Sequence, residues 1–172
     1  IIGAGLRTSA ELAALVNGAA SHCTELEDVS FPEAMPTVNI IPAIFAIGEK
    51  LGASGRSVLE GVVLAFELAA RPSYMLTPGE GGAFDRGFQP GPVLAPAAVA
   101  AVAAKMMGLA PAQTLNAISI ATSFGCGLVR QVGSGAHVFE PGLAGRSGIT
   151  SAMLAARGMT GEPTIMEGKS GF

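Results

Sequence analysis

Apolar residues recur at helical spacing along much of the chain, and proline or glycine stands at most of the points where the spacing stops. The first segment has apolar residues at i, i+3, i+4 and i+7, namely Leu12, Leu15, Val16 and Ala19. A capping-box spacing from Thr8 to Glu11 precedes them. We therefore expect a helix here that ends near Ser21.

The same signals predict further helices over residues 37–51, 57–72, 93–107, 111–124 and 142–157. Gly52, Gly108 and Gly158 follow three of these segments, and glycine most readily adopts the left-handed conformation that ends a helix. In the helix over 57–72, Leu59 and Val63 belong to an apolar stripe. We expect that stripe to face the core.

Two glycine-rich stretches interrupt these helices, at 73–92 and 125–135. Irregular stretches of this length within a domain are usually functional or mobile. No segment alternates apolar and polar residues convincingly with period two, and no repeat recurs at a fixed spacing. The chain is therefore predicted to be all-α, as a single helical bundle over residues 1–172.

The composition fits a chain that buries much of itself, since 49% of its 172 residues are hydrophobic and 13% are charged. So little charge leaves apolar surface to be covered by a second domain, a partner or an oligomer interface. A net charge of −3 with scattered basic residues gives no footprint for nucleic acid. The longest apolar run, residues 97–104, is too short to span a membrane. We therefore expect neither a nucleic acid nor a membrane as a partner.

The start of the chain and its cysteines favour the cytoplasm. No basic and apolar leader opens the sequence, so it shows no sign of secretion. Cys23 and Cys126 have no CxxC spacing and suit free thiols in a reducing compartment. A disulfide between them is the alternative. We expect a soluble, cytoplasmic protein.

Nearly all of the unusual polar residues lie in three breaks between helices, at 22–35, 85–90 and 130–140. These residues are His22, Glu25, Glu27, Asp28, Arg86, Gln89, Arg130, His137 and Glu140. Each break adjoins a helix end, so we assume that all three converge on one cleft. Imidazoles and carboxylates there suit proton transfer, and arginines suit the binding of a substrate carboxylate.

A structural interpretation stays open for each of these residues. Acidic side chains such as these most often lie on a solvated loop. His22 at a helix end can bind the last carbonyls, and Arg86 and Arg130 can be ordinary ion-pair partners. His137 lies between a Gly-Ser-Gly loop and Val138, where a polar side chain has no evident local role. A functional role and a purely structural role are therefore equally open for His137.

Spacing disfavours metal, nucleotide and serine-nucleophile chemistry. The two histidines lie far apart in the sequence and outside any carboxylate–histidine helix motif, which makes a weak metal site. The glycines of GEGGAFDRG follow no strand, as a phosphate-binding loop would require. No serine lies in a nucleophile-elbow motif. We expect no metal and no other cofactor.

Several blocks of sequence, taken in order, resemble the MmgE/PrpD family, which includes 2-methylcitrate dehydratase, cis-aconitate decarboxylase and iminodisuccinate epimerase. The blocks are NGAASHCTELED, RGFQP, GSGAHVFEPGLAGRSGI, AARGMTG and EGKSGF. The resemblance implies a cofactor-free, homodimeric enzyme of small polycarboxylates, built from a large helical domain and a smaller α+β domain. It also implies that this chain is an incomplete helical domain, without the family's first helices and its α+β domain.

The chain departs from the family at positions that the resemblance implies are functional. Val29 stands where the family has threonine, and Met35 replaces an active-site histidine. Gln89 replaces a second histidine, and His137 replaces a lysine that would bind or protonate a substrate carboxylate. These changes indicate a more neutral pocket and a substrate less charged than citrate or aconitate.

The resulting hypothesis is a lyase or isomerase that abstracts a proton beside a carboxylate or carbonyl. His137 is the principal acid or base, positioned by Glu140, Glu25 or Asp28. The catalytic candidates are His137, Glu25, Asp28 and His22, and the substrate-binding candidates are Gln89, Arg86, Arg130, Met35, Val29 and Glu140. The alternatives are a catalytically silent, assembly-forming relative, or hydrolase or other isomerase chemistry on the same scaffold.

Overall fold

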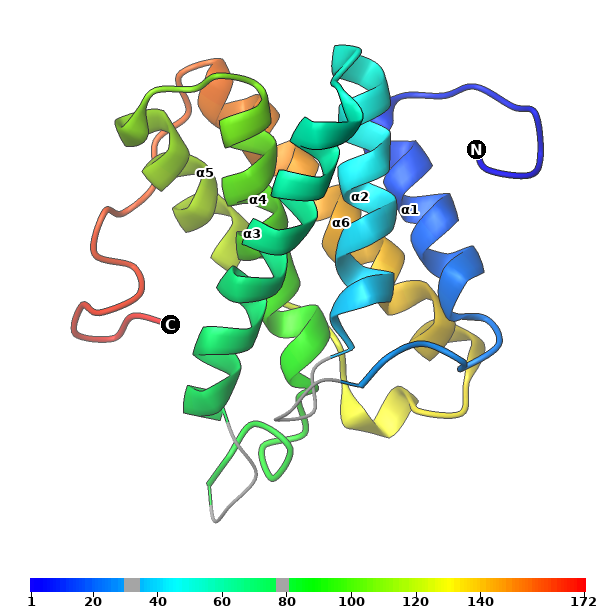
Figure 1. Cartoon of the computed structure of the whole chain (residues 1–172). Helices are drawn as coiled ribbons and strands as arrows, with labels where there is room; N and C mark the ends of the chain where they lie inside the picture. Colours follow the sequence, from blue (N-terminus) through cyan, green and yellow to red (C-terminus); the bar gives the residue numbers. More distant parts are fainter. Residues whose placement is uncertain (30–34, 77–80) are drawn as a thin grey trace.

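The computed structural model describes residues 1–29, 35–76 and 81–172, and within these ranges the chain is all-α, as predicted (Figure 1). Its helices are α1 Ala10–His22, α2 Pro36–Leu51, α3 Gly55–Ser73, α4 Pro90–Met106, α5 Pro111–Thr122 and α6 Gly135–Ala156, with short 3-10 helices η1 Tyr74–Leu76 and η2 Val129–Gln131. The described residues contain no strand, only an isolated antiparallel bridge between Phe88 and Leu128.

Helices α4 and α6 form the centre of the bundle, where α6 packs against α1, α2, α4 and α5. Small residues permit this close packing. A Cβ on Gly148 of α6 would lie 2.5 Å from the Cβ of Val99 in α4, so only glycine fits at this crossing. The core around it consists mainly of buried alanine, valine and isoleucine side chains. The helix backbones therefore approach each other closely, and the core needs few large side chains to fill it.

Proline and glycine mark the helix boundaries, as the sequence indicated. Pro36, Pro90 and Pro111 each occupy the first turn of a helix, where the missing amide hydrogen costs nothing. Gly52 ends α2 with a φ of 62°, and its amide donates back to the carbonyl of Glu49. The predicted starts of α2 and α5 were thus accurate to within one residue, whereas α4 begins at Pro90, three residues before its predicted start.

The apolar stripes do not all face the core. Leu59 and Val63 of α3 are 68% and 66% exposed, so the predicted orientation of α3 was wrong for them. In α1, Leu12 and Val16 are also exposed, whereas the buried face carries Ala10, Ala14, Asn17, Gly18 and His22. The small residues face inward because α1 lies so close to α6.

Helix α6 begins at Gly135, seven residues before the predicted start at Gly142. The prediction started the helix after Pro141, whereas Pro141 lies inside the second turn of α6. His137 and Glu140 are therefore helical residues at i and i+3, on one face. Pro72 likewise lies within α3 and does not end it.

Within the described residues, no helix combines the length and the apolar character needed to cross a membrane. Both cysteines are free thiols: Cys23 is exposed and Cys126 is partly buried.

Candidate functional site

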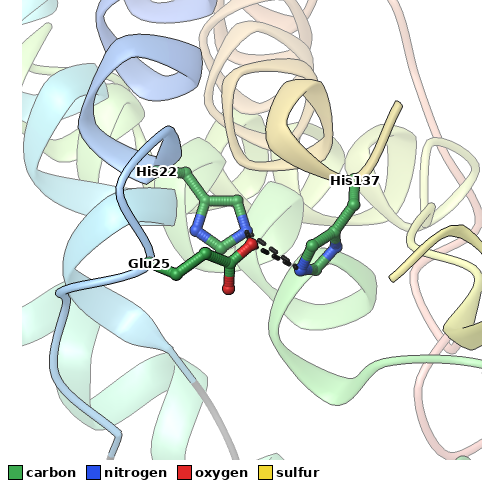
Figure 2. A group of neighbouring side chains, drawn as sticks. All are labelled: His22, Glu25 and His137. Atoms are coloured by element: carbon green, nitrogen blue, oxygen red, sulfur yellow. Dashed lines mark hydrogen bonds and ion pairs between the residues drawn. The ribbon is translucent and has the colours of Figure 1, made fainter. Parts of the chain in front are cut away.

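The two histidines of the chain meet at one end of the bundle, although 115 residues separate them. His22 is the last residue of α1 and His137 lies in the first turn of α6. Their Nε2 atoms are 3.2 Å apart, and the rings meet edge to face at 74°. Figure 2 shows both rings pointing toward each other. Both side chains are buried.

A backbone crossing of α1 and α6 brings the two rings together. A Cβ on Gly18 would lie 2.6 Å from the Cα of Gly142, and a Cβ on Gly142 would collide with the carbonyl of Leu15. Gly18 lies one turn before His22, and Gly142 lies little more than one turn after His137. The glycine contact therefore fixes the separation of the imidazoles.

A carboxylate faces the far nitrogen of each imidazole. The Glu27 carboxylate lies 2.5 Å from Nδ1 of His22, and the Glu140 carboxylate lies 3.2 Å from Nδ1 of His137. Both carboxylates are themselves almost fully buried. Since a carboxylate only accepts, Nδ1 of His137 is the donor to Glu140, whereas Nδ1 of His22 lies beside the Glu27 carboxylate without forming a hydrogen bond to it. His22 thus does not use its ring to bind helix carbonyls.

The two Nε2 atoms face each other at a hydrogen-bond distance, and the tautomer of each ring decides which of them donates. Two unprotonated nitrogens 3.2 Å apart repel each other unless a proton or a cation lies between them. The pair is therefore placed to hold a proton or a cation between His22 and His137.

Glu25 approaches the same two nitrogens from a loop. Its Oε1 is 3.4 Å from Nε2 of His137 and 3.9 Å from Nε2 of His22, as Figure 2 shows. The backbone of Glu25 is left-handed, with a φ of 53°, which is costly for a residue that has a Cβ. The side chain is 54% exposed, whereas those of the histidines are buried, so Glu25 is the solvent-facing member of the group.

Gln89 and Glu140 form a network behind His137. Gln89 Nε2 donates to Glu140 Oε2 at 3.0 Å and to the carbonyl of Leu128 at 3.3 Å. The other oxygen of Glu140 accepts from the amide of Leu128 at 3.1 Å. The bridge between Phe88 and Leu128 holds these two loops together. Glu140 is therefore fixed by several donors.

Of the predicted site residues, the structure brings His22, Glu25, Gln89, His137 and Glu140 into one group. The assumed convergence of the three breaks is thus confirmed for these residues. The two histidines thus meet despite the distance in sequence from which a weak metal site was predicted. Glu27 was named among the polar residues of the first break, but not among the catalytic or substrate-binding candidates.

The remaining candidates have no described contact with the histidine pair. Asp28 accepts from the amide of Thr37 at the start of α2, and Met35 is the N-cap residue of that helix. Val29 is 71% exposed. Arg86 and Arg130 are exposed. Residues 30–34 of the acidic segment lie outside the described residues.

Glu140 also acts on Cys126. The Cys126 thiol lies 4.0 Å from the backbone oxygen of Glu140. Burial raises the pKa of Cys126 to about 11, and the negative charge of Glu140 adds to this rise, against a smaller lowering by Arg146. Cys126 is therefore a neutral thiol at physiological pH.

The group is rich in negative charge. Glu25, Glu27 and Glu140 surround two imidazoles, and no Lys or Arg in the part of the chain that the structure describes forms an ion pair with them. Three carboxylates beside two imidazoles make this an acidic cluster. Such a site attracts cations and repels polyanions.

Comparison with known proteins gives matches along the whole chain. A model of the MmgE/PrpD N-terminal domain matches residues 1–172. The cis-aconitate decarboxylase-like protein oryM of Aspergillus oryzae is 28% identical over 97% of this chain and 36% of its own length. Cis-aconitate decarboxylases of Homo sapiens and Aspergillus terreus are 27% and 28% identical, again over 97% of this chain and 35% of their own lengths. The chain thus spans about a third of these relatives.

Proposed function

Because this chain belongs to the MmgE/PrpD family, we propose that it forms part of a lyase or isomerase that acts on a small carboxylic acid without a cofactor. The relatives named above are lyases or lyase-like proteins. The observation that carries the proposal is the buried His22–His137 pair, with the exposed Glu25 carboxylate beside it.

The proposed reaction is a proton abstraction beside the substrate carboxylate, followed by elimination. Glu25 takes the proton from carbon, since it is the exposed member of the group. The electron pair of the broken C–H bond forms the new C=C bond as the C–O bond breaks. The shared proton of the histidine pair passes from His137 to the leaving hydroxyl, which departs as water.

The resting state is then restored within the site. Protonated Glu25 returns its proton to His137, whose Nε2 lies 3.4 Å away. Glu140 holds the His137 ring in place during both transfers. Where no leaving group is present, return of the proton to carbon gives isomerisation instead. The same residues therefore serve either outcome.

The charge of the site supports a substrate with fewer carboxylates than citrate. Glu25, Glu27 and Glu140 would repel each additional anionic group. Arg86 and Arg130 are exposed residues near the ends of the bridged loops and remain candidates for binding the single carboxylate. The residues proposed to line the substrate's path to the histidine pair are Asp28, Met35 and Val29.

The proposal extends to assembly. A second, α+β domain and a homodimer partner would cover apolar residues that the fold leaves exposed, among them Leu59, Val63 and Phe139. The free thiols of Cys23 and Cys126 suit a reducing compartment such as the cytoplasm.

The test uses the intact protein with a panel of small hydroxy acids and unsaturated acids in deuterium oxide, followed by proton NMR. We expect loss of the α-proton signal for one member of the panel, with formation of an alkene or uptake of deuterium. The Glu67→Gln variant is the matched control, because Glu67 pairs with Arg71 on the exposed surface of α3. Absence of both depletion and label uptake would favour the catalytically silent, assembly-forming alternative.

A further inference from the structure

We propose that His22, His137 and Glu25 form a binding site for one divalent transition-metal ion of the zinc class. The ligand atoms are Nε2 of each histidine and one carboxylate oxygen, and all lie within 4.8 Å of one another. The proposal rests on these positions and does not depend on the lyase activity.

The spacing of the three atoms matches the edges of a tetrahedron around zinc. Bonds of about 2.0–2.2 Å at tetrahedral angles place ligand atoms roughly 3.3–3.5 Å apart. The observed separations are 3.2 Å between the imidazoles, and 3.4 and 3.9 Å from Glu25 to His137 and His22. The longest belongs to the exposed side chain, which is free to move a few tenths of an ångström. A fourth position stays open to water.

The surroundings of both imidazoles fit metal ligation. A histidine that binds zinc through one nitrogen usually donates its other N–H to a carboxylate or carbonyl, which fixes the tautomer. Glu140 plays this part for His137, and the buried Glu27 carboxylate lies within reach of Nδ1 of His22. With its proton on Nδ1, each ring offers the lone pair of Nε2 to the space between the two rings. A structural, cation-free role for the pair would not need this orientation on both rings.

Charge and donor type select the ion. Three carboxylates around two neutral imidazoles give the cluster a net negative charge that a divalent ion would offset. Magnesium and calcium prefer all-oxygen ligands, whereas imidazole suits zinc, cobalt, nickel and copper. The site therefore favours a late first-row ion.

A metal ion and the proposed acid–base proton exclude each other. Both occupy the space between the same two nitrogens, so His137 bonded to a metal cannot donate a proton to a leaving group. The metal-bound form is thus an inactive form of the proposed lyase. Metal binding itself is measured without any turnover, so failure of one proposal leaves the other standing.

The experiment titrates Co²⁺ into metal-free intact protein and records visible absorption. We expect one equivalent to bind with the intense bands of four-coordinate cobalt, and Zn²⁺ to displace it. The Glu25→Gln variant, altered at an exposed side chain, should bind at least tenfold more weakly. The buried Glu27→Gln variant should lose about ten- to a hundredfold through His22.

The His137→Gln variant should abolish the four-coordinate spectrum, and Glu67→Gln should leave it unchanged. Circular dichroism identifies a variant that fails to fold, in which case Glu25→Gln decides the result. Absence of a stoichiometric site, a six-coordinate spectrum, or unaltered binding by folded Glu25→Gln and His137→Gln proteins would overturn the proposal.

Discussion

Gly18 and Gly142 touch backbone to backbone where α1 crosses α6, and this contact determines the distance between His22 and His137. A Cβ on Gly18 would lie 2.6 Å from the Cα of Gly142. Each glycine lies about one turn from its histidine, so even a small separation of the helices moves the rings apart. The placement of the histidine pair is therefore set by helix packing, whereas Glu25, the third residue of both proposals, reaches the pair from a loop.

The Gly142→Ala substitution should destabilise the protein by about 2 kcal/mol or more, because the added methyl meets the rigid backbone carbonyl of Leu15. Thermal unfolding of the intact protein measures this. Gly55→Ala is the matched control, because a Cβ on Gly55 meets nothing within 4 Å. It should be neutral or slightly stabilising. Equal stability of the two variants would contradict the close crossing.

Cys126 should resist alkylation at neutral pH while Cys23 reacts, because only the thiolate is nucleophilic. With a pKa of about 11, roughly one Cys126 thiol in a thousand is ionised at pH 8, and its reaction rate should rise about tenfold per pH unit up to the pKa. Mass spectrometry of iodoacetamide-treated protein resolves the two sites. Alkylation of both cysteines at the same rate at pH 8 would refute this.

The Glu140→Gln substitution should lower the pKa of Cys126, since it removes a negative charge that disfavours the thiolate. Cys126 should then be alkylated faster at any given pH below 11. The Glu67→Gln protein should retain the original rate, because Glu67 lies on the exposed face of α3. An unchanged Cys126 rate in Glu140→Gln would indicate that Glu140 is not charged next to His137.

The His137→Ala substitution should lower turnover by about a hundredfold or more, the usual contribution of a general acid or base. The comparison requires a substrate found in the deuterium oxide screen and measures kcat on the intact protein. The fold should survive, since His137 lies in the first turn of α6 and the helix core is formed by later residues. Intact turnover in the folded variant would remove His137 from the mechanism.

The limits of sequence-based prediction are clearest at α6. Proline and glycine predicted where α2 and α5 begin and where α2 ends, because these residues act on the local backbone. Pro141 acts locally too, yet packing of α6 against its four neighbours keeps the helix intact there. The i, i+3 pairing of His137 with Glu140 was hidden by that error.

The histidine pair could only be assumed from the sequence, because the contact depends on how α1 and α6 cross. Spacing in the chain carries no information on two residues 115 positions apart. The small residues of α1, including Ala14 and Gly18, were the available signal, since a helix with a small inward face packs closely. The prediction relied instead on the larger apolar residues of α1, such as Leu12 and Val16, and these lie on the exposed face.

The left-handed backbone of Glu25 allows the backbone strain at this residue to be measured separately from metal binding by its carboxylate. Glycine adopts a φ of 53° without a Cβ clash, so Glu25→Gly should be more stable than Glu25→Gln by about 1 kcal/mol. Both variants lose the carboxylate and should bind Co²⁺ equally weakly. Unfolding and cobalt titration of the two proteins, side by side, provide the measurement. If Glu25→Gly is no more stable than Glu25→Gln, the conformation of Glu25 stores no strain. If instead the glycine variant keeps full cobalt affinity, Glu25 is not a ligand, and the site reduces to the two imidazoles.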